Sequence, residues 1–146
     1  MKFVVAIDGT AASGKGTLGK KIAEHFDFHY LDTGILYRVV AFNLQYDSDS
    51  SKISAQKVQN ALNLLTNKNF NLNALRNEKI TQKASEISKN KIVRDTLLCY
   101  QRDFSLQNGG SVLDGRDIGT VVCPDADVKI FVDADVKIRA KRRYDQ

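Results

Sequence analysis

The chain has 146 residues, of which 42% are hydrophobic and 27% charged, a composition suited to one compact domain with a buried core. No apolar run reaches the roughly 20 residues that cross a bilayer, so we expect a cytoplasmic protein without a membrane partner. The net charge of +5 favours an anionic partner, and the two distant cysteines, Cys99 and Cys123, indicate neither a disulfide framework nor a zinc site.

The first third of the chain alternates between strand and helix patterns. A β-branched apolar run predicts a first strand, a period near 3.6 residues predicts the helix after it, and the pattern then repeats. This alternation predicts an α/β fold with a doubly wound parallel sheet and helices on both faces. The expected elements are strands over Lys2–Asp8 and Phe28–Leu31, a loop over Asp32–Gly34, and helices ending near Phe26 and spanning Ile35–Leu44.

The middle of the chain is more polar and predicts an insertion at about residues 47–84, on a core formed by about 1–46 and 85–146. Residues 46–52 are rich in turn-forming side chains, and Asn-rich turns follow the next predicted helix. The remaining expected elements are helices over Ala55–Leu65, Glu78–Ser88 and Lys91–Phe104, strands over Ser111–Leu113 and Val128–Val132, and a last helical segment from Asp135 with no stop signal before Gln146.

A glycine-rich segment between the first strand and helix, GTAASGKGT, fits the G-x-x-x-x-G-K pattern. Small residues let backbone N–H groups curl round phosphate oxygens, and the helix dipole adds positive charge there. Lys15 adds a full charge for the β- and γ-phosphates, and Gly16 moves the usual metal-side hydroxyl to Thr17. We therefore predict that ATP is bound by Gly9, Thr10, Ala11, Ala12, Ser13, Gly14, Lys15, Gly16 and Thr17.

A second motif, Asp114-Gly115-Arg116-Asp117, follows the strand predicted at residues 111–113. The C-terminal edge of a parallel strand is where doubly wound folds bind ligands, so Asp114 is a candidate, with Thr17, for holding Mg²⁺. The alternative is an aspartate that caps a turn. Arg116 offers a bidentate cation for a phosphate, and Asp117 an acceptor for a base amino group or a ribose hydroxyl.

Three motifs together resemble the bacterial cytidylate kinase family in order and spacing: Ile7–Thr17, Leu31–Arg38 (LDTGILYR) and Asp114–Val122 (DGRDIGTVV). The resemblance covers essentially the whole chain. It implies a phosphate-loop kinase fold, transfer of the γ-phosphoryl group of ATP with Mg²⁺ to CMP or dCMP in pyrimidine metabolism, and an acceptor-binding role for the insertion. No general base is needed, because a phosphate monoester has a second pKa of about 6 and is largely deprotonated at neutral pH.

The resemblance also assigns contacts with the acceptor nucleotide to individual residues. Alternatives stay open for several of them: Tyr37 as a core ring, Ser85 as an exposed helix serine and Arg94 as a solvated charge. For Arg102 we expect a solvated charge on a helix face. The acceptor-binding residues implied are Thr33, Tyr37, Arg38, Ser85, Arg94, Arg116 and Asp117.

The basic residues near the end of the chain form a further candidate site. Arg139, Arg142 and Arg143 fall at i, i+3 and i+4, which places them on one face of a helix. They could clamp phosphates, and we expect Arg142 to act in catalysis with Lys15 and Asp114. The alternative is a solvated basic helix.

The resemblance implies a longer protein, since a mobile lid, a last core strand and a closing helix are not among these 146 residues. We therefore expect weak or no activity, and self-association through an open sheet edge, although the family state is a monomer. Two alternatives stay open: a non-catalytic nucleotide-binding fragment and a phosphate-loop kinase for another small acceptor. Basic and aromatic residues are not interleaved as a stacking platform requires, so we expect no nucleic-acid partner.

Overall fold

The structure is a computed structural model that describes residues 1–45 and 52–146, so almost all of the turn-rich stretch predicted at 46–52 lies outside the described residues. Contacts divide the chain into two compact units. The sheet unit consists of Met1–Thr33 and Gln101–Gln146, and the helical unit of Gly34–Tyr100. The helical unit is larger than the predicted insertion at 47–84, because it also takes in residues on either side of that range.

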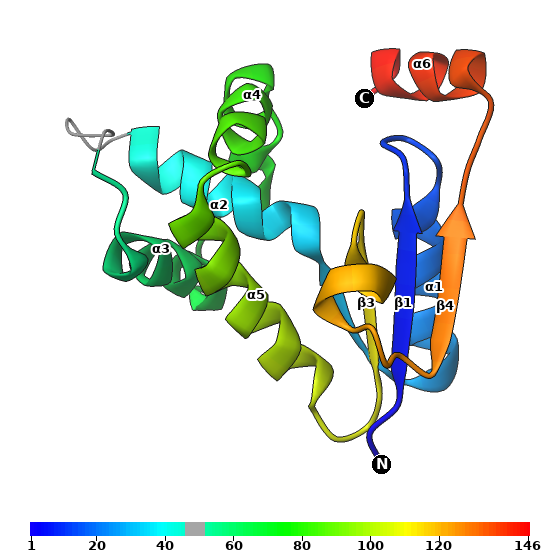
Figure 1. The fold of residues 1–146 in the computed structure, drawn as a ribbon. Coiled ribbons are helices and arrows are strands. Elements are labelled where there is room, and N and C mark those ends of the chain that lie inside the picture. The colour runs from blue at the N-terminus through cyan, green and yellow to red at the C-terminus, as the bar shows by residue number, and fades with distance from the viewer. Residues whose placement is uncertain (46–51) are drawn as a thin grey trace. The chain divides into compact units, whose positions relative to one another are not determined.

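The sheet unit is built on four parallel strands in the order β2-β3-β1-β4, of which Figure 1 labels β3, β1 and β4. The central strand β1 is buried at Val5, Ala6 and Ile7, as expected for a parallel strand covered on both faces. From β1 the chain builds the sheet outward in both directions, which confirms the predicted doubly wound order. The strands are β1 (Val4–Gly9), β2 (His29–Asp32), β3 (Ser111–Gly115) and β4 (Val128–Val132).

Helical segments lie on both faces of this sheet, as predicted. Helix α1 (Lys15–Phe26) covers one face, where Ala23 packs with Val5, Ile7 and their neighbours in an apolar cluster. The short helical turn η3 (Ile118–Val122) contacts β1 and β3. It meets Asp8, whose side chain points to the face opposite that of Ile7 because side chains alternate along a strand.

The register brings three strand ends to one edge of the sheet. Asp114 on β3 pairs with Ile7 on β1 and with Asp32 on β2. The glycine-rich segment begins where β1 ends, at the same edge. The carboxyl ends of the strands therefore hold both motifs that the sequence singles out, as the fold class requires.

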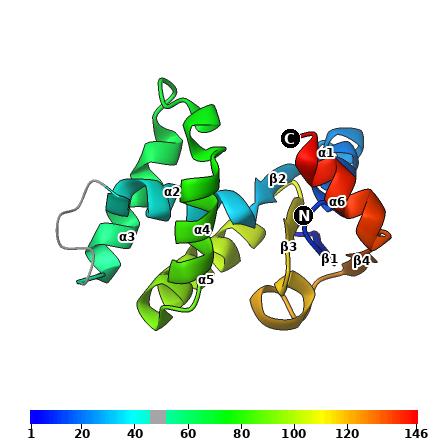
Figure 2. The ribbon, with the colours of Figure 1, turned by 90° about the horizontal axis from the view of Figure 1, so that it is seen from above.

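In the helical unit, α2 (Thr33–Gln45) is the most buried helix, with five apolar side chains at most 1% exposed, and Figure 2 shows the other helices arranged around it. The predicted loop over Asp32–Gly34 is wrong, because β2 runs to Asp32 and α2 begins at Thr33. The Thr33 hydroxyl donates to the carbonyl oxygen of Asp114 at 2.8 Å and so fixes this junction. The other helices are α3 (Ala55–Leu62), η1 (Asn63–Thr66), η2 (Leu72–Leu75), α4 (Glu78–Ile87) and α5 (Lys91–Ser105), whose last residues belong to the sheet unit.

The last described helix, α6 (Val136–Tyr144), is capped at its N-terminus by Asp135, whose carboxylate accepts from the Lys137 N–H. It follows β4, which pairs only with β1 among the described strands and leaves Phe131 71% exposed. An open edge with an exposed aromatic side chain can pair with another chain, so self-association stays a prediction. Among the described residues, none of the helices has both the length and the apolar character of a membrane span.

Candidate functional site

The glycine-rich segment forms a loop between β1 and α1 whose backbone is bent into the left-handed region twice. Ala12 has φ 58° and Gly14 has φ 95°, and the Ser13 N–H donates to the Thr10 carbonyl at 3.3 Å. Alternation between right- and left-handed residues turns successive N–H groups toward one concave side, which is the geometry of an anion-binding nest. The loop predicted from the sequence is therefore present in a form that suits a phosphate.

Two polar features of this loop lack protein partners in the described part of the chain. Gly14 caps α1 without any side chain to accept from the first helical N–H groups. The Ser13 hydroxyl is buried, with the residue 6% exposed, and has no hydrogen-bond partner. Buried polar groups are normally satisfied, and a phosphate of ATP placed at this helix N-terminus would satisfy both features.

Arg142 reaches the loop from α6. Its guanidinium donates to the Ala12 carbonyl at 3.3 Å, and the position of a Cβ on Gly14 would lie 3.5 Å from the same nitrogen. Arg139 instead turns back and donates to the Ala134 carbonyl at 3.0 Å. Arg142, one of the three arginines of the predicted basic face, thus borders the phosphate loop.

Asp114 lies at the end of β3, 3% exposed, and its carboxylate accepts a short hydrogen bond from the Tyr30 hydroxyl. Burial raises the pKa of Asp114 to about 6, with a smaller rise from Asp32, while the bond to Tyr30 and the charge of Lys15 act to lower it. Burial also raises the pKa of Tyr30, and the hydrogen bond to Asp114 adds to that rise. Tyr30 therefore remains a neutral donor that orients the carboxylate.

Tyr30 fits there because α1 carries glycine where its ring passes. A Cβ on Gly19 would lie 2.9 Å from Tyr30 Cε2, and a Cβ on Gly16 would lie 3.7 Å from the Tyr30 hydroxyl. Sequence reasoning assigned no role to Tyr30, since its partner Asp114 is 84 residues away. One signal in the sequence was available. Glycines three residues apart on the helix leave room for the ring of a tyrosine on the short strand that follows.

The titration of Asp114 predicts a pH-dependent stability in the absence of divalent cations. The pKa of Asp114 is about 6 in the folded chain and 3.8 in the unfolded chain. As the pH rises, the Asp114 carboxyl therefore loses its proton at a lower pH in the unfolded chain than in the folded chain. The free energy of unfolding should therefore fall between pH 4 and pH 6, by up to about 3 kcal/mol from this group. Urea denaturation of the wild type and of Asp114→Asn from pH 4 to pH 7 measures it.

Because the asparagine side chain does not titrate, the Asp114→Asn variant should gain stability relative to the wild type across that window. The contributions of the other carboxylates to the pH dependence of stability are the same in both proteins and cancel in the difference. Two stability curves that stay parallel from pH 4 to pH 7 would contradict the raised pKa.

A metal ion at this edge would have few protein ligands. In the part of the chain that the structure describes, no three His, Cys, Asp or Glu side chains gather in one place. Mg²⁺ bound with a nucleotide needs only one or two carboxylates, since phosphates and water supply its other oxygen ligands. Asp114, with Thr17 exposed on the first turn of α1, fits that sparse donor set.

The turn after Asp114 holds two further predicted residues. Arg116 is exposed and Asp117 is half-buried just before η3. Arg102 is exposed on α5, as predicted for a solvated charge, but its guanidinium also donates to the carbonyl oxygens of Val121 at 2.9 Å and Val122 at 3.1 Å. Those partners lie about 20 residues further along the chain, where no local pattern marks them.

The remaining predicted residues lie on three helices of the helical unit. Tyr37 and Arg38 are half-buried on α2, and Ser85 is exposed on α4. Arg94, on α5, is exposed and points a nitrogen at the Ser88 carbonyl at 3.5 Å. The sheet unit thus carries the phosphate loop, Thr33 and the Asp114–Asp117 motif, whereas the helical unit carries the other four acceptor residues, whose roles stay predictions.

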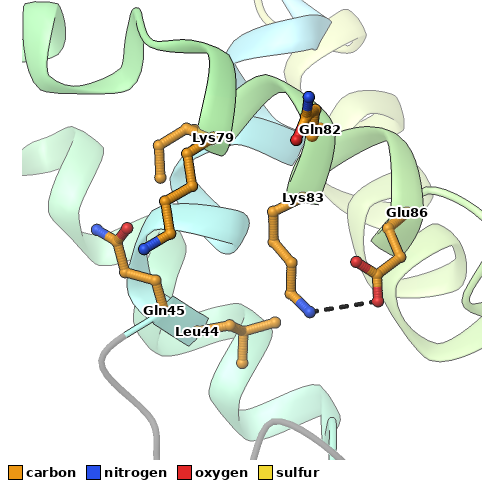
Figure 3. Close-up of a pocket in the computed structure, with 7 residues that line it drawn as sticks. Leu44, Gln45, Lys79, Gln82, Lys83 and Glu86 are labelled. Carbon is orange, nitrogen blue, oxygen red and sulfur yellow. Dashed lines mark hydrogen bonds and ion pairs between the residues drawn. The ribbon is translucent and has the colours of Figure 1, made fainter.

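The helical unit also has a pocket beside the C-terminal end of α2. Figure 3 shows Lys83 turned toward Glu86, with which it forms an ion pair at 3.3 Å. None of the predicted site residues lines this pocket. It is lined by Leu44, Gln45, Lys79, Ile80, Gln82, Lys83 and Glu86.

Comparison with known proteins supplies the family. The family profile described as cytidylate kinase matches residues 5–146. The chain is 51% identical over 141 residues to the cytidylate kinase of Bradyrhizobium diazoefficiens, covering 97% of this chain and 66% of that protein. It is 52% identical over 147 residues to the cytidylate kinase of Bartonella henselae, covering 99% of this chain and 66% of that protein. The chain thus spans slightly less than two thirds of the length of these relatives.

A crystal structure of a Thermus thermophilus protein aligns with 99% of this chain and 72% of its own chain, at 17% identity and a TM-score of 0.47. The fold assignment therefore stands on the parallel sheet order and on the family match. With the phosphate loop, the Asp114 motif and the match over residues 5–146 in agreement, the chain belongs to the cytidylate kinase family.

Proposed function

We propose that this chain carries the ATP site and most of the acceptor site of an enzyme that transfers a phosphoryl group from ATP to CMP or dCMP, giving ADP and CDP or dCDP. The observation that carries the proposal is the loop between β1 and α1. It combines a family match with a helix N-terminus that no side chain caps and a buried Ser13 hydroxyl without a partner in the described residues. A triphosphate would satisfy both of these polar features.

In this proposal the protein positions the reactants and neutralises charge. Lys15 contacts the β- and γ-phosphates. Arg142, whose guanidinium donates to the Ala12 carbonyl, lies beside the loop that binds them. Mg²⁺, held by Asp114 and Thr17, would offset charge on the phosphate oxygens. The acceptor needs no general base, because its phosphate is already largely deprotonated at neutral pH. It is held by Thr33, Tyr37, Arg38, Ser85, Arg94, Arg116 and Asp117.

The length of the chain bears on its activity. It spans 66% of relatives that carry the family name. Closing segments exclude water and complete the charged site in kinases of this kind. We therefore propose that these 146 residues bind ATP and turn over slowly, and that an inactive, non-catalytic nucleotide-binding fragment is the second candidate.

A coupled assay of ADP release and a set of calorimetric titrations test both candidates. ATP should bind, and CMP and dCMP should bind at least tenfold more tightly than UMP or AMP. Active kinases turn over about 1 to 100 times per second, and ADP release with CMP should stay below the lower end of that range, about 1 per second. Release above 1 per second contradicts the slow turnover, binding without any release favours the second candidate, and equal affinity for AMP and CMP contradicts the proposed substrate.

A further inference from the structure

The turn η3 directly follows Arg116 and Asp117. A single carboxylate, that of Asp8 on strand β1, holds its N-terminal end. Both oxygens of Asp8 are used: Oδ1 accepts from the Ile118 N–H at 2.7 Å and Oδ2 from the Gly119 N–H at 2.8 Å. Asp8 lies on β1, one residue before the phosphate loop begins. The carboxylate therefore links two segments that are 110 residues apart in the sequence.

Arg102 holds the opposite end of the same turn. Its Nε donates to the Val122 carbonyl and its Nη2 to the Val121 carbonyl. An anion at the N–H end of a helical turn and a cation at its carbonyl end both complement the turn's dipole. We call this pair of side chains, Asp8 and Arg102, the turn clamp.

The backbone of Asp117 is part of the clamped turn. Its carbonyl oxygen accepts from the Val121 N–H at 2.9 Å and from the Val122 N–H at 3.1 Å. Gly119 lets the carboxylate approach closely, since a Cβ there would lie 3.3 Å from Asp8 Oδ2 and 3.2 Å from Lys129 Cδ. Fixing η3 thus also fixes the chain at Asp117 and, one residue earlier, Arg116.

We propose that the turn clamp is a positioning device, in which Asp8 and Arg102 hold Arg116 and Asp117 in the geometry that receives the acceptor nucleotide. Asp8 lies on β1, the strand that leads into the phosphate loop. The clamp therefore holds the turn that would bind the acceptor in a fixed position relative to the loop that would bind ATP. Neither clamp residue needs to touch a substrate. The inference rests on the proposed function, since it presumes that Arg116 and Asp117 bind CMP.

Three variants and a control, titrated separately with CMP and with ATP by calorimetry, test the clamp. Asp8→Asn keeps the shape of the side chain but replaces one acceptor by a donor. Arg102→Lys keeps the charge but loses the two-pronged donor, and Arg102→Gln removes the charge. Asp127→Asn is the matched control, because Asp127 accepts from the Val4 N–H at 2.8 Å at the start of β1 and touches neither motif.

The expected result is a selective loss. Asp8→Asn and Arg102→Gln should weaken CMP binding about tenfold or more, Arg102→Lys should fall between them and the wild type, and ATP affinity should change by less than about twofold. Asp127→Asn should lower the urea midpoint without a change in CMP affinity. In the double variant Asp8→Asn with Asp117→Asn, the loss of CMP affinity should be smaller than the sum of the two single losses, because part of the effect of Asp8 passes through Asp117.

Wild-type CMP affinity in both Asp8→Asn and Arg102→Gln would overturn the clamp. Equal losses for CMP and ATP would also overturn it, since they indicate only a weakened fold. If Asp8→Asn does not fold, the two Arg102 variants decide the matter. Failure of the wild type to bind CMP would overturn the proposed function and, with it, the clamp, and the wild-type titration alone distinguishes this case.

Discussion

Replacing Lys15 with methionine should weaken ATP binding by roughly 10- to 100-fold, the loss expected for a charge-assisted hydrogen bond to phosphate. Lys15 is the first residue of α1, directly after the bend at Gly14, so its charge lies at the helix N-terminus. Methionine keeps a similar length and good helix propensity, so the fold should persist. Calorimetric titration with ATP, with circular dichroism to check folding, measures the effect.

Lys21→Met is the matched control for this substitution. Lys21 lies on the same helix but is exposed and six residues further from the loop. It removes the same charge from the chain and so tests whether net charge alone attracts the nucleotide. Equal losses of affinity in the two variants would contradict a specific role for Lys15.

Gly9→Ala should destabilise the fold by about 3 kcal/mol, near the upper end of the usual cost of overpacking. A Cβ at this position would lie 2.2 Å from the carbonyl oxygen of Val132 and 3.0 Å from the Ser13 hydroxyl. Val132 is the residue paired with Gly9 in the β1–β4 register. A backbone atom cannot rotate away as a side chain can, so the strands must separate where the phosphate loop begins.

Gly16→Ala provides the comparison for this second substitution. Its Cβ would meet Tyr30 and Asp114 at 3.7 and 3.9 Å, which are ordinary contacts. Alanine inside a helix gains up to about 1 kcal/mol over glycine, so this variant should be as stable as the wild type or more stable. Urea midpoints of the two variants measure the difference. A Gly9→Ala midpoint equal to that of Gly16→Ala would contradict the close approach of β4.

Most of the secondary structure could be predicted because hydrophobic periodicity records how each element is buried. β4 was predicted with the bounds Val128–Val132 that the structure has, and α1 ends at Phe26 as expected. Asp32-Thr33-Gly34 misled the prediction, because these residue types favour turns. In the fold, the bond from Thr33 to the Asp114 carbonyl holds helical backbone directly against the strand.

The candidate site could be predicted only where its residues are contiguous in the sequence. The phosphate loop and the Asp114–Asp117 motif are of that kind. Tyr30, Asp8 and Arg102 were missed because each acts on a partner that only the fold brings near: Asp114, the Ile118 and Gly119 N–H groups, and the carbonyls of Val121 and Val122. Their side chains are common on strands and helices, and no spacing rule links them to those partners.

The packing of Tyr30 against α1 constrains how the sequence can change. At position 19 even a methyl group would enter the space of the Tyr30 ring, and the hydroxyl of that ring orients Asp114. A larger side chain on α1 would therefore displace the ring and release the carboxylate at the edge of the sheet. Substitution of Gly19 is tolerable only together with a smaller residue at position 30, so the two positions are expected to covary, although they are 11 positions apart in the sequence and only one belongs to a helix.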